Sequence, residues 1–347
     1  MVKNRQLNFE LLRVFSMMLV LLFHANFWSI GEPCFQSGFN VHDLIRTFLE
    51  SLCMPCVNLF IMISGWFGIN PTVRGLSKFL FQCIFISVLI ELVFVLTYNE
   101  EFGINTVREI LYLSHTDYFV KSYILLFLFS PILNTFVEYN NEVLTRKTLF
   151  ALGVFVLFLG WICGIGEGGR LLDFCFYYLT ARFLNKFHPN LIMNLSKAKL
   201  LSYYIIASIA LTLLYVCPNA IGLGSPSLSQ RYWSYISPFC MVQTIVLFLL
   251  YAKIKIAPPT IANTNSFISR ICVALEFFSS SCFAVYLINI NYRIHPLFKE
   301  YFYSLHNNFT FPSWCCLVII STFAFFLICV LLDKLRITCW NLVSHRN

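Results

Sequence analysis

Three ionisable side chains lie within the first long apolar stretch of the sequence, where they could serve chemistry. Glu10, Arg13 and His24 fall inside the segment ELLRVFSMMLVLLFH. Ionisable groups at the depth of a bilayer cost several kcal/mol unless they face a protein interior or a water-filled cavity, so each is a candidate for a functional site. A neutral imidazole can act as a general base or as a nucleophile.

The spacing of these residues predicts that they share one helix face. Arg13 and His24 are eleven residues apart, which in an α-helix is three turns plus about 20°, with a rise of roughly 16 Å. Glu10 lies three residues before Arg13, within reach of an ion pair on the same face. The alternative is that His24 is a hydrogen-bonded structural histidine and Arg13 an anchor that sets the topology.

The composition predicts a membrane protein of the all-α class. Hydrophobic residues make up 59% of the 347-residue chain and charged residues only 12%, and the mean hydropathy is +0.74. Such a chain is too apolar for a soluble globular domain. The first apolar run is long enough to span a bilayer and lacks a small-residue cleavage site, so we expect it to stay in the protein.

Cysteine usage and net charge argue against a disulfide-stabilised protein and a nucleic-acid-binding protein. The 14 cysteines lie mostly in apolar segments, where Cys acts as a small hydrophobe, so we expect no disulfide framework. A net charge of +8 is explained by basic cytoplasmic loops and does not indicate nucleic-acid binding. We find no convincing set of metal ligands.

Apolar runs predict a polytopic protein with about ten transmembrane helices in one domain, residues 1–347. The predicted spans are Leu11–Ile30, Ser51–Ile69, Leu76–Tyr98, Phe119–Val137, Leu149–Ile165, Leu171–Phe187, Leu200–Val216, Tyr235–Ile254, Leu275–Asn291 and Trp314–Leu332.

The distribution of basic residues predicts the orientation. If the N-terminus is cytoplasmic, most of the 24 Lys and Arg residues fall on the cytoplasmic side, as the positive-inside rule requires. Both termini are then cytoplasmic. Arg13 faces the cytoplasmic side of the bilayer, and His24 lies in its outer half.

Two basic residues follow the second span. Arg74 and Lys78 are four residues apart and so share a helix face; positive-inside topology alone is the favoured explanation of this spacing. Together with Arg13 they could instead form a phosphate-binding cluster. At the inner end of the second span, Ser64 and Gly65 indicate either close helix packing or a functional opening.

Other polar residues give weaker predictions. Asp43, Arg46 and Glu50 are spaced as on a short surface helix in an outer connection. Glu91, in the middle of the third span, has no partner close in the sequence. It is a site candidate only because burying a carboxylate in the bilayer costs free energy. The three serines and two asparagines of SSSCFAVYLININY are costly in lipid, so we expect them to face the bundle interior.

Several segments, in this order, resemble the acyltransferase 3 family of integral membrane acyltransferases. The Arg13 to His24 spacing in FELLRVFSMMLVLLFH is similar to the N-terminal signature of the family, and NLFIMISGWF resembles its second-span motif. The segments YFVKSYILLFLFSPILN, SYISPF and SSCFAVYLIN resemble later motifs, the last two those of the polysaccharide-modifying branch. Together they sample nearly the whole chain.

The resemblance implies transfer of an acyl group, usually acetyl, from coenzyme A to a hydroxyl of an extracytoplasmic or lipid-linked glycan. His24 would then be catalytic. Arg13 would bind the donor together with Arg74 and Lys78, which correspond loosely to a basic pair after the second-span motif of the family. The second residue of the pair is a Lys here, and the spacing differs from the usual pattern.

In this scheme Glu10 and Ser64 would support the site. Asn289 stands where many members have a His after Tyr-Leu-Ile, so the resemblance gives no catalytic residue there. The expected partners are acetyl-CoA as co-substrate, the glycan and membrane lipids, with no metal and no nucleic acid. The expected location is the inner (plasma) membrane of a bacterium.

Transport is the competing function. A chain of ten spans with Glu91, Glu276 and His24 buried could pass protons or a small polar solute, or flip a lipid-linked glycan. The ordered motifs and the lack of visible inverted repeats favour the acyltransferase.

Overall fold

The described part of the protein is mainly helical and contains no β-strand. The computed structural model describes residues 6–35, 38–99, 103–111, 118–163, 170–256 and 267–344. The helices are α1 (Leu7–Ala25), α2 (Phe27–Ile30), α3 (Val41–Cys53), α4 (Cys56–Phe67), α5 (Val73–Tyr98), α6 (Ile104–Leu111), α7 (Tyr118–Tyr139), α8 (Glu142–Val156), the π-helix η1 (Leu157–Ile162), α9 (Arg170–Phe187), α10 (Asn190–Met193), α11 (Lys197–Ala220), α12 (Pro226–Tyr232), α13 (Pro238–Ala252), α14 (Phe267–Ser279), α15 (Cys282–Asn289), α16 (Ile294–Asn308) and α17 (Phe311–Ser344).

Within the described residues, 8 helical segments are long and apolar enough to cross a membrane. They confirm a polytopic all-α membrane protein and overlap eight of the ten predicted spans. The other two predicted spans are also helical, but they are not both long enough and apolar enough to meet this criterion. Leu171–Phe187 lies in α9, which carries Asp173, Arg182 and Lys186. Tyr235–Ile254 contains α13, whose 15 residues extend only about 22 Å, less than the roughly 30 Å of a bilayer core.

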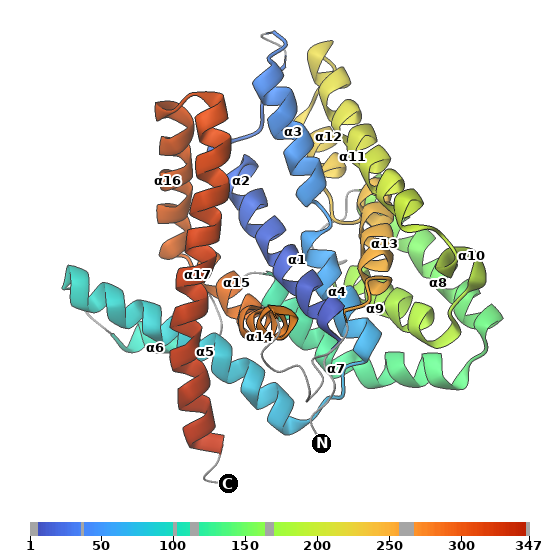
Figure 1. Ribbon diagram of the computed structural model, residues 1–347, viewed down its shortest axis with the longest axis horizontal. Coiled ribbons are helices and arrows are strands. Elements are labelled where there is room, and N and C mark those ends of the chain that lie inside the picture. Colours follow the sequence, from blue (N-terminus) through green and yellow to red (C-terminus); the bar gives the residue numbers. More distant parts are fainter. Residues whose placement is uncertain are drawn as a thin grey trace.

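The first helix, α1, lies at the centre of the bundle. It packs against α3, α4, α13, α14, α15, α16 and α17, so it contacts helices from the beginning, middle and end of the chain. Figure 1 shows α1 between α16 and α17 on one side and α11 and α13 on the other. Its first turn and the last turn of α17 both lie toward the lower end of that view. A central helix can present ionisable groups to protein on most of its circumference.

Gly65 lets α4 approach α9 closely. A Cβ atom at this position would collide with the backbone oxygen of Tyr178 and would lie 2.9 Å from its Cα atom. The hydroxyl of Tyr178 accepts a hydrogen bond from the Ile69 backbone N–H and donates one to Asn134 Oδ1, so α9 is tied to the end of α4 and to α7. Of the two explanations for Gly65, the structure supports close packing.

The substitution Gly65→Ala should therefore destabilise the bundle. The added methyl meets backbone atoms that cannot swing away, and overpacking of this kind costs about 1–3 kcal/mol. Thermal unfolding of the detergent-purified protein measures the effect. Gly103→Ala is the matched control, because a methyl there meets nothing within 4 Å. Equal unfolding midpoints for the two variants would contradict the close approach.

Candidate active site

Arg13 and Glu10 form an ion pair on the inward face of α1. Arg13 Nη1 donates to Glu10 Oε1 at 2.9 Å and to Oε2 at 3.0 Å. The Glu10 side chain is 5% exposed and the Arg13 side chain 34% exposed. A guanidinium has five N–H donors, so Arg13 can bind Glu10 through Nη1 and an anion through its other donors. The pair predicted from the three-residue spacing is present.

A cavity of about 360 Å³ adjoins this ion pair. Its wall includes Arg13 from α1, Ser64 from α4, Lys78 from α5, and Ser279 and Ser280 from the end of α14 and the turn that follows. Lys78 is exposed and Arg13 is partly exposed, so the basic end of the cavity reaches the surface. The structure thus brings three of the sequence-predicted site residues to one cavity.

Arg74 stands apart from these residues. It lies in the first turn of α5, one turn before Lys78, and it is exposed. It does not line the cavity. Its placement fits the explanation from membrane topology better than that of a phosphate ligand.

Aromatic rings form much of the cavity wall. The Tyr123 hydroxyl lies 3.2 Å from Ser64 Oγ, and Ser64 Oγ donates to the Phe60 backbone oxygen at 2.9 Å. The Tyr123 ring stacks on those of Phe79 and Phe119 at centroid distances of 5.3 and 5.9 Å. The cavity therefore combines a basic, hydroxyl-bearing end with an apolar interior.

His24 lies at the other end of the same face of α1, in contact with the last third of the chain. The residue is 4% exposed. Its Nδ1 atom is 2.5 Å from Asn289 Oδ1, at the end of α15. With the Asn289 amide in this orientation, Oδ1 is the acceptor, so Nδ1 carries the proton and Nε2 keeps its lone pair. This is the tautomer that a general base or nucleophile acting through Nε2 needs.

Two further rings surround His24. Trp28 of α2 stacks on the imidazole at a centroid distance of 4.5 Å and an interplanar angle of 23°. His295 of α16 meets His24 edge to face at 5.5 Å, and its Nδ1 is 3.1 Å from the Asn289 backbone oxygen. Trp28 is 44% exposed, so one side of the His24 environment reaches the surface.

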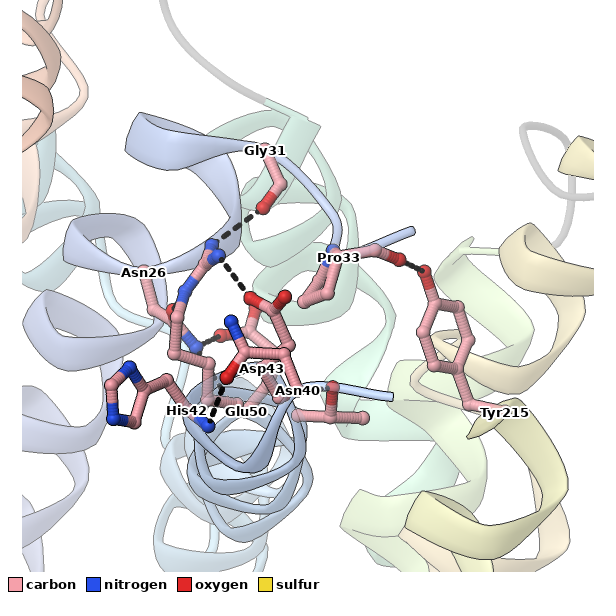
Figure 2. Close-up of polar contacts among 10 residues, drawn as sticks. Asn26, Gly31, Pro33, Asn40, His42, Asp43, Glu50 and Tyr215 are labelled. Carbon is pink, nitrogen blue, oxygen red and sulfur yellow. Dashed lines mark hydrogen bonds and ion pairs between the residues drawn. The ribbon is translucent and has the colours of Figure 1, made fainter. Parts of the chain in front are cut away.

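The chain bends just after His24, and a buried polar cluster supports the bend. α1 ends at Ala25, and Asn26 leads into α2 with a non-helical backbone. Asn26 Nδ2 donates to Glu50 Oε2 and to the Arg46 backbone oxygen, and Arg46 Nε donates back to Asn26 Oδ1. Figure 2 shows Asn26, Asp43 and Glu50 gathered at this point.

Asp43, Arg46 and Glu50 were predicted to lie on a surface helix, and this prediction is wrong about their exposure. The three residues do lie on one helix, α3, but Arg46 is 4% and Glu50 1% exposed. Arg46 also donates to Asp43 Oδ1 and to the Gly31 backbone oxygen. Charged groups are buried at this depth only when they are paired and hydrogen-bonded, and the sequence-distant Asn26 provides part of that pairing.

Glu91 has a structural partner that the sequence did not reveal. Arg293 Nη2 lies 3.0 Å from Glu91 Oε2, and the Tyr292 hydroxyl donates to Glu91 Oε1 at 2.5 Å. Glu276, which the transport alternative required to be buried, is exposed. The carboxylates proposed for a proton path are therefore not assembled with His24.

The sequence analysis did not identify Asn289 or His295 as partners of His24. It did single out Asn289 as a polar residue in an apolar segment. Asn289, with no assigned role, is the hydrogen-bond partner, and His295 was not considered. The signal for Asn289 was its polar side chain in an apolar segment. Of the serines and asparagines expected to face the interior there, Ser280 is exposed, and the other four are buried: Ser279, Ser281, Asn289 and Asn291. In the described part of the chain, no group of three His, Cys, Asp or Glu side chains could hold a metal ion.

Comparison with known proteins identifies the family. The sequence model of the acyltransferase 3 family, described as an acyltransferase domain, matches residues 6–333. No curated protein and no solved structure gives a significant match. The chain belongs to the acyltransferase 3 family, and with its apolar helices it is an integral membrane acyltransferase.

The pairing of Glu91 with Arg293 gives a stability prediction. Glu91→Ala should lower stability by roughly 2 kcal/mol, because it removes hydrogen bonds to charged groups and leaves the guanidinium without its counter-ion. The double variant Glu91→Ala/Arg293→Met should recover part of the loss. Thermal unfolding of the two variants tests this. Wild-type stability in Glu91→Ala would reject a structural role for the pair.

Proposed function

We propose that this acyltransferase moves an acyl group, acetyl in the simplest case, from cytoplasmic acyl-CoA to a hydroxyl of an extracytoplasmic or lipid-linked glycan. One observation carries the proposal: a single face of α1 bears a basic cavity at Arg13 and, about 16 Å further along, a buried imidazole whose Nδ1 is hydrogen-bonded to Asn289. Coenzyme A combines anionic phosphates with a long flexible arm. The phosphates would bind at the basic end, near Arg13, and the arm would carry the thioester toward His24.

The basic end of the cavity would hold the phosphates. Arg13 offers a planar guanidinium that matches phosphate oxygens, and Lys78 adds a point charge beside it. Glu10 holds the Arg13 side chain in place through the 2.9 Å contact. Ser64 and Ser280 supply hydroxyls in the same wall.

His24 would carry the chemistry through Nε2. With Nδ1–H donated to Asn289, the Nε2 lone pair takes the proton of the acceptor hydroxyl as its oxygen attacks the thioester carbonyl. The carbon–sulfur bond then breaks, and the imidazolium returns the proton to the leaving thiolate. A covalent route through an acyl-imidazole would use the same lone pair.

The orientation follows from charge. Both termini are proposed to be cytoplasmic, in a bacterial plasma membrane, which puts Arg13 on the side where acyl-CoA is made. Trp28 and His295 then face the outer side, from which the glycan would approach. No observation in the described residues favours transport, since Glu91 is paired with Arg293 and Glu276 is exposed.

Arg13→Ala should raise KM for acetyl-CoA by roughly 10- to 100-fold, the equivalent of one hydrogen bond between charged groups. Arg13→Lys should keep part of the affinity as a point charge. Lys78→Ala should cause a smaller loss, and Arg74→Ala the smallest, because Arg74 does not line the cavity. Steady-state kinetics with labelled acetyl-CoA measures these values. Normal donor use by a folded Arg13→Ala variant would remove the donor-binding role.

His24→Ala and His24→Asn should lower acetyl transfer by roughly 10²–10⁴-fold or more, since neither side chain takes up a proton at neutral pH. His24→Gln tests a purely structural role, because its amide can still form hydrogen bonds. The measurement is transfer of label from acetyl-CoA to glycan in membranes, alongside thermal stability and donor binding.

The matched control for His24 is His42→Gln, at an exposed histidine of α3. This variant should transfer acetyl normally. Substantial transfer by either amide variant of His24 would reject the catalytic assignment, whereas loss of transfer with intact donor binding places the defect in the chemical step.

A further inference from the structure

A second, much smaller cavity lies deeper in the bundle than the basic one. Its volume is about 30 Å³, against about 360 Å³ for the larger cavity. Phe119 of α7 and Cys282 and Phe283 of α15 line both, so the two are neighbours. Val20 and Val57 complete one side of the smaller cavity.

The small cavity lies between the basic end and His24. Val20 comes seven residues after Arg13 and four before His24, so it shares their helix face and lies one turn, about 6 Å, below His24. Side chains of a helix lean toward its N-terminus, and the His24 ring therefore lies over the turn that Val20 begins. An acyl group that came from the larger cavity would meet the small one before it met the imidazole.

We propose that this small cavity is the acyl subsite of the enzyme and that Phe283 and Val57 restrict the donor to the shortest acyl chains. The inference rests on the proposed use of acyl-CoA. A space of about 30 Å³ is about twice the roughly 10–15 Å³ that a cavity needs to hold one water molecule. It suits an acyl group of two or three heavy atoms, such as acetyl, better than a chain of several carbons.

The wall is held by ring packing. The Phe283 ring stacks on Phe79 at 4.9 Å and 19°, and the Phe119 ring meets Tyr286 at 5.1 Å and 61°. A longer acyl chain would have to displace these rings from their contacts, and a close-packed interior resists that. A hydrophobic pocket discriminates against one extra methylene by roughly 10- to 200-fold.

The test compares acetyl-, propionyl- and butyryl-CoA as donors in membranes that contain the glycan acceptor, with kcat/KM for each. The wild type should prefer acetyl over butyryl by at least about tenfold. Phe283→Leu widens the cavity and should shift the butyryl-to-acetyl ratio upward by about tenfold. Val57→Ile narrows it and should lower the propionyl-to-acetyl ratio.

The control is Phe302→Leu, at a buried phenylalanine of α16 that does not line either cavity. It should leave the donor ratios unchanged, because simple destabilisation lowers activity with every donor alike. Wild-type ratios in both Phe283→Leu and Val57→Ile, or equal use of butyryl and acetyl by the wild type, would overturn the acyl subsite alone. Turnover of none of the three donors by the wild type would overturn the proposed function with it.

Discussion

Burial of ionisable groups along α1 is the constraint on which the rest of the structure depends. Glu10 and His24 are each only 4% exposed on the central helix, and a buried ionisable group needs a protein partner. Glu10 has its partner three residues along, in Arg13. His24 has its partner in Asn289, 265 residues along the chain. That second contact requires α15 to pack against the end of α1, and the packing of α14, α16 and α17 around α1 makes this possible.

The polar groups just beyond the end of α1 also need protein partners. Where the helix stops at Ala25, Asn26 receives and gives hydrogen bonds in a cluster with Arg46 and Glu50 (Figure 2). The cluster holds α3 against the bend that carries Trp28 onto the imidazole. Helix geometry and buried polar pairing thus support each other, because neither the bend nor the buried charges would be stable alone.

The two cavities divide the proposed reaction path by size and polarity. The larger one is lined by Arg13 and Lys78 at its surface end and by aromatic rings inside. The smaller one is lined by aliphatic, aromatic and thiol groups and lies within one turn of His24. A donor with a charged head, a flexible arm and a small acyl group would meet these environments in that order.

The sequence by itself determined the class of the protein, most of its spans and the common face of Glu10, Arg13 and His24. These features are local: hydrophobic run length and the 3.6-residue period act over one helix, so a linear pattern is enough to read them. Family membership could also be read from ordered local motifs.

Only the tertiary structure decided which partners these residues have. Asn289 for His24, Arg293 for Glu91 and Asn26 for Arg46 are pairings between segments that lie apart in the sequence. Lys78 rather than Arg74 lines the cavity, because the cavity lies beside the second turn of α5 and not beside its first. No local pattern records these choices, since each depends on which helix faces pack together, and that is set by the summed contacts of the whole bundle.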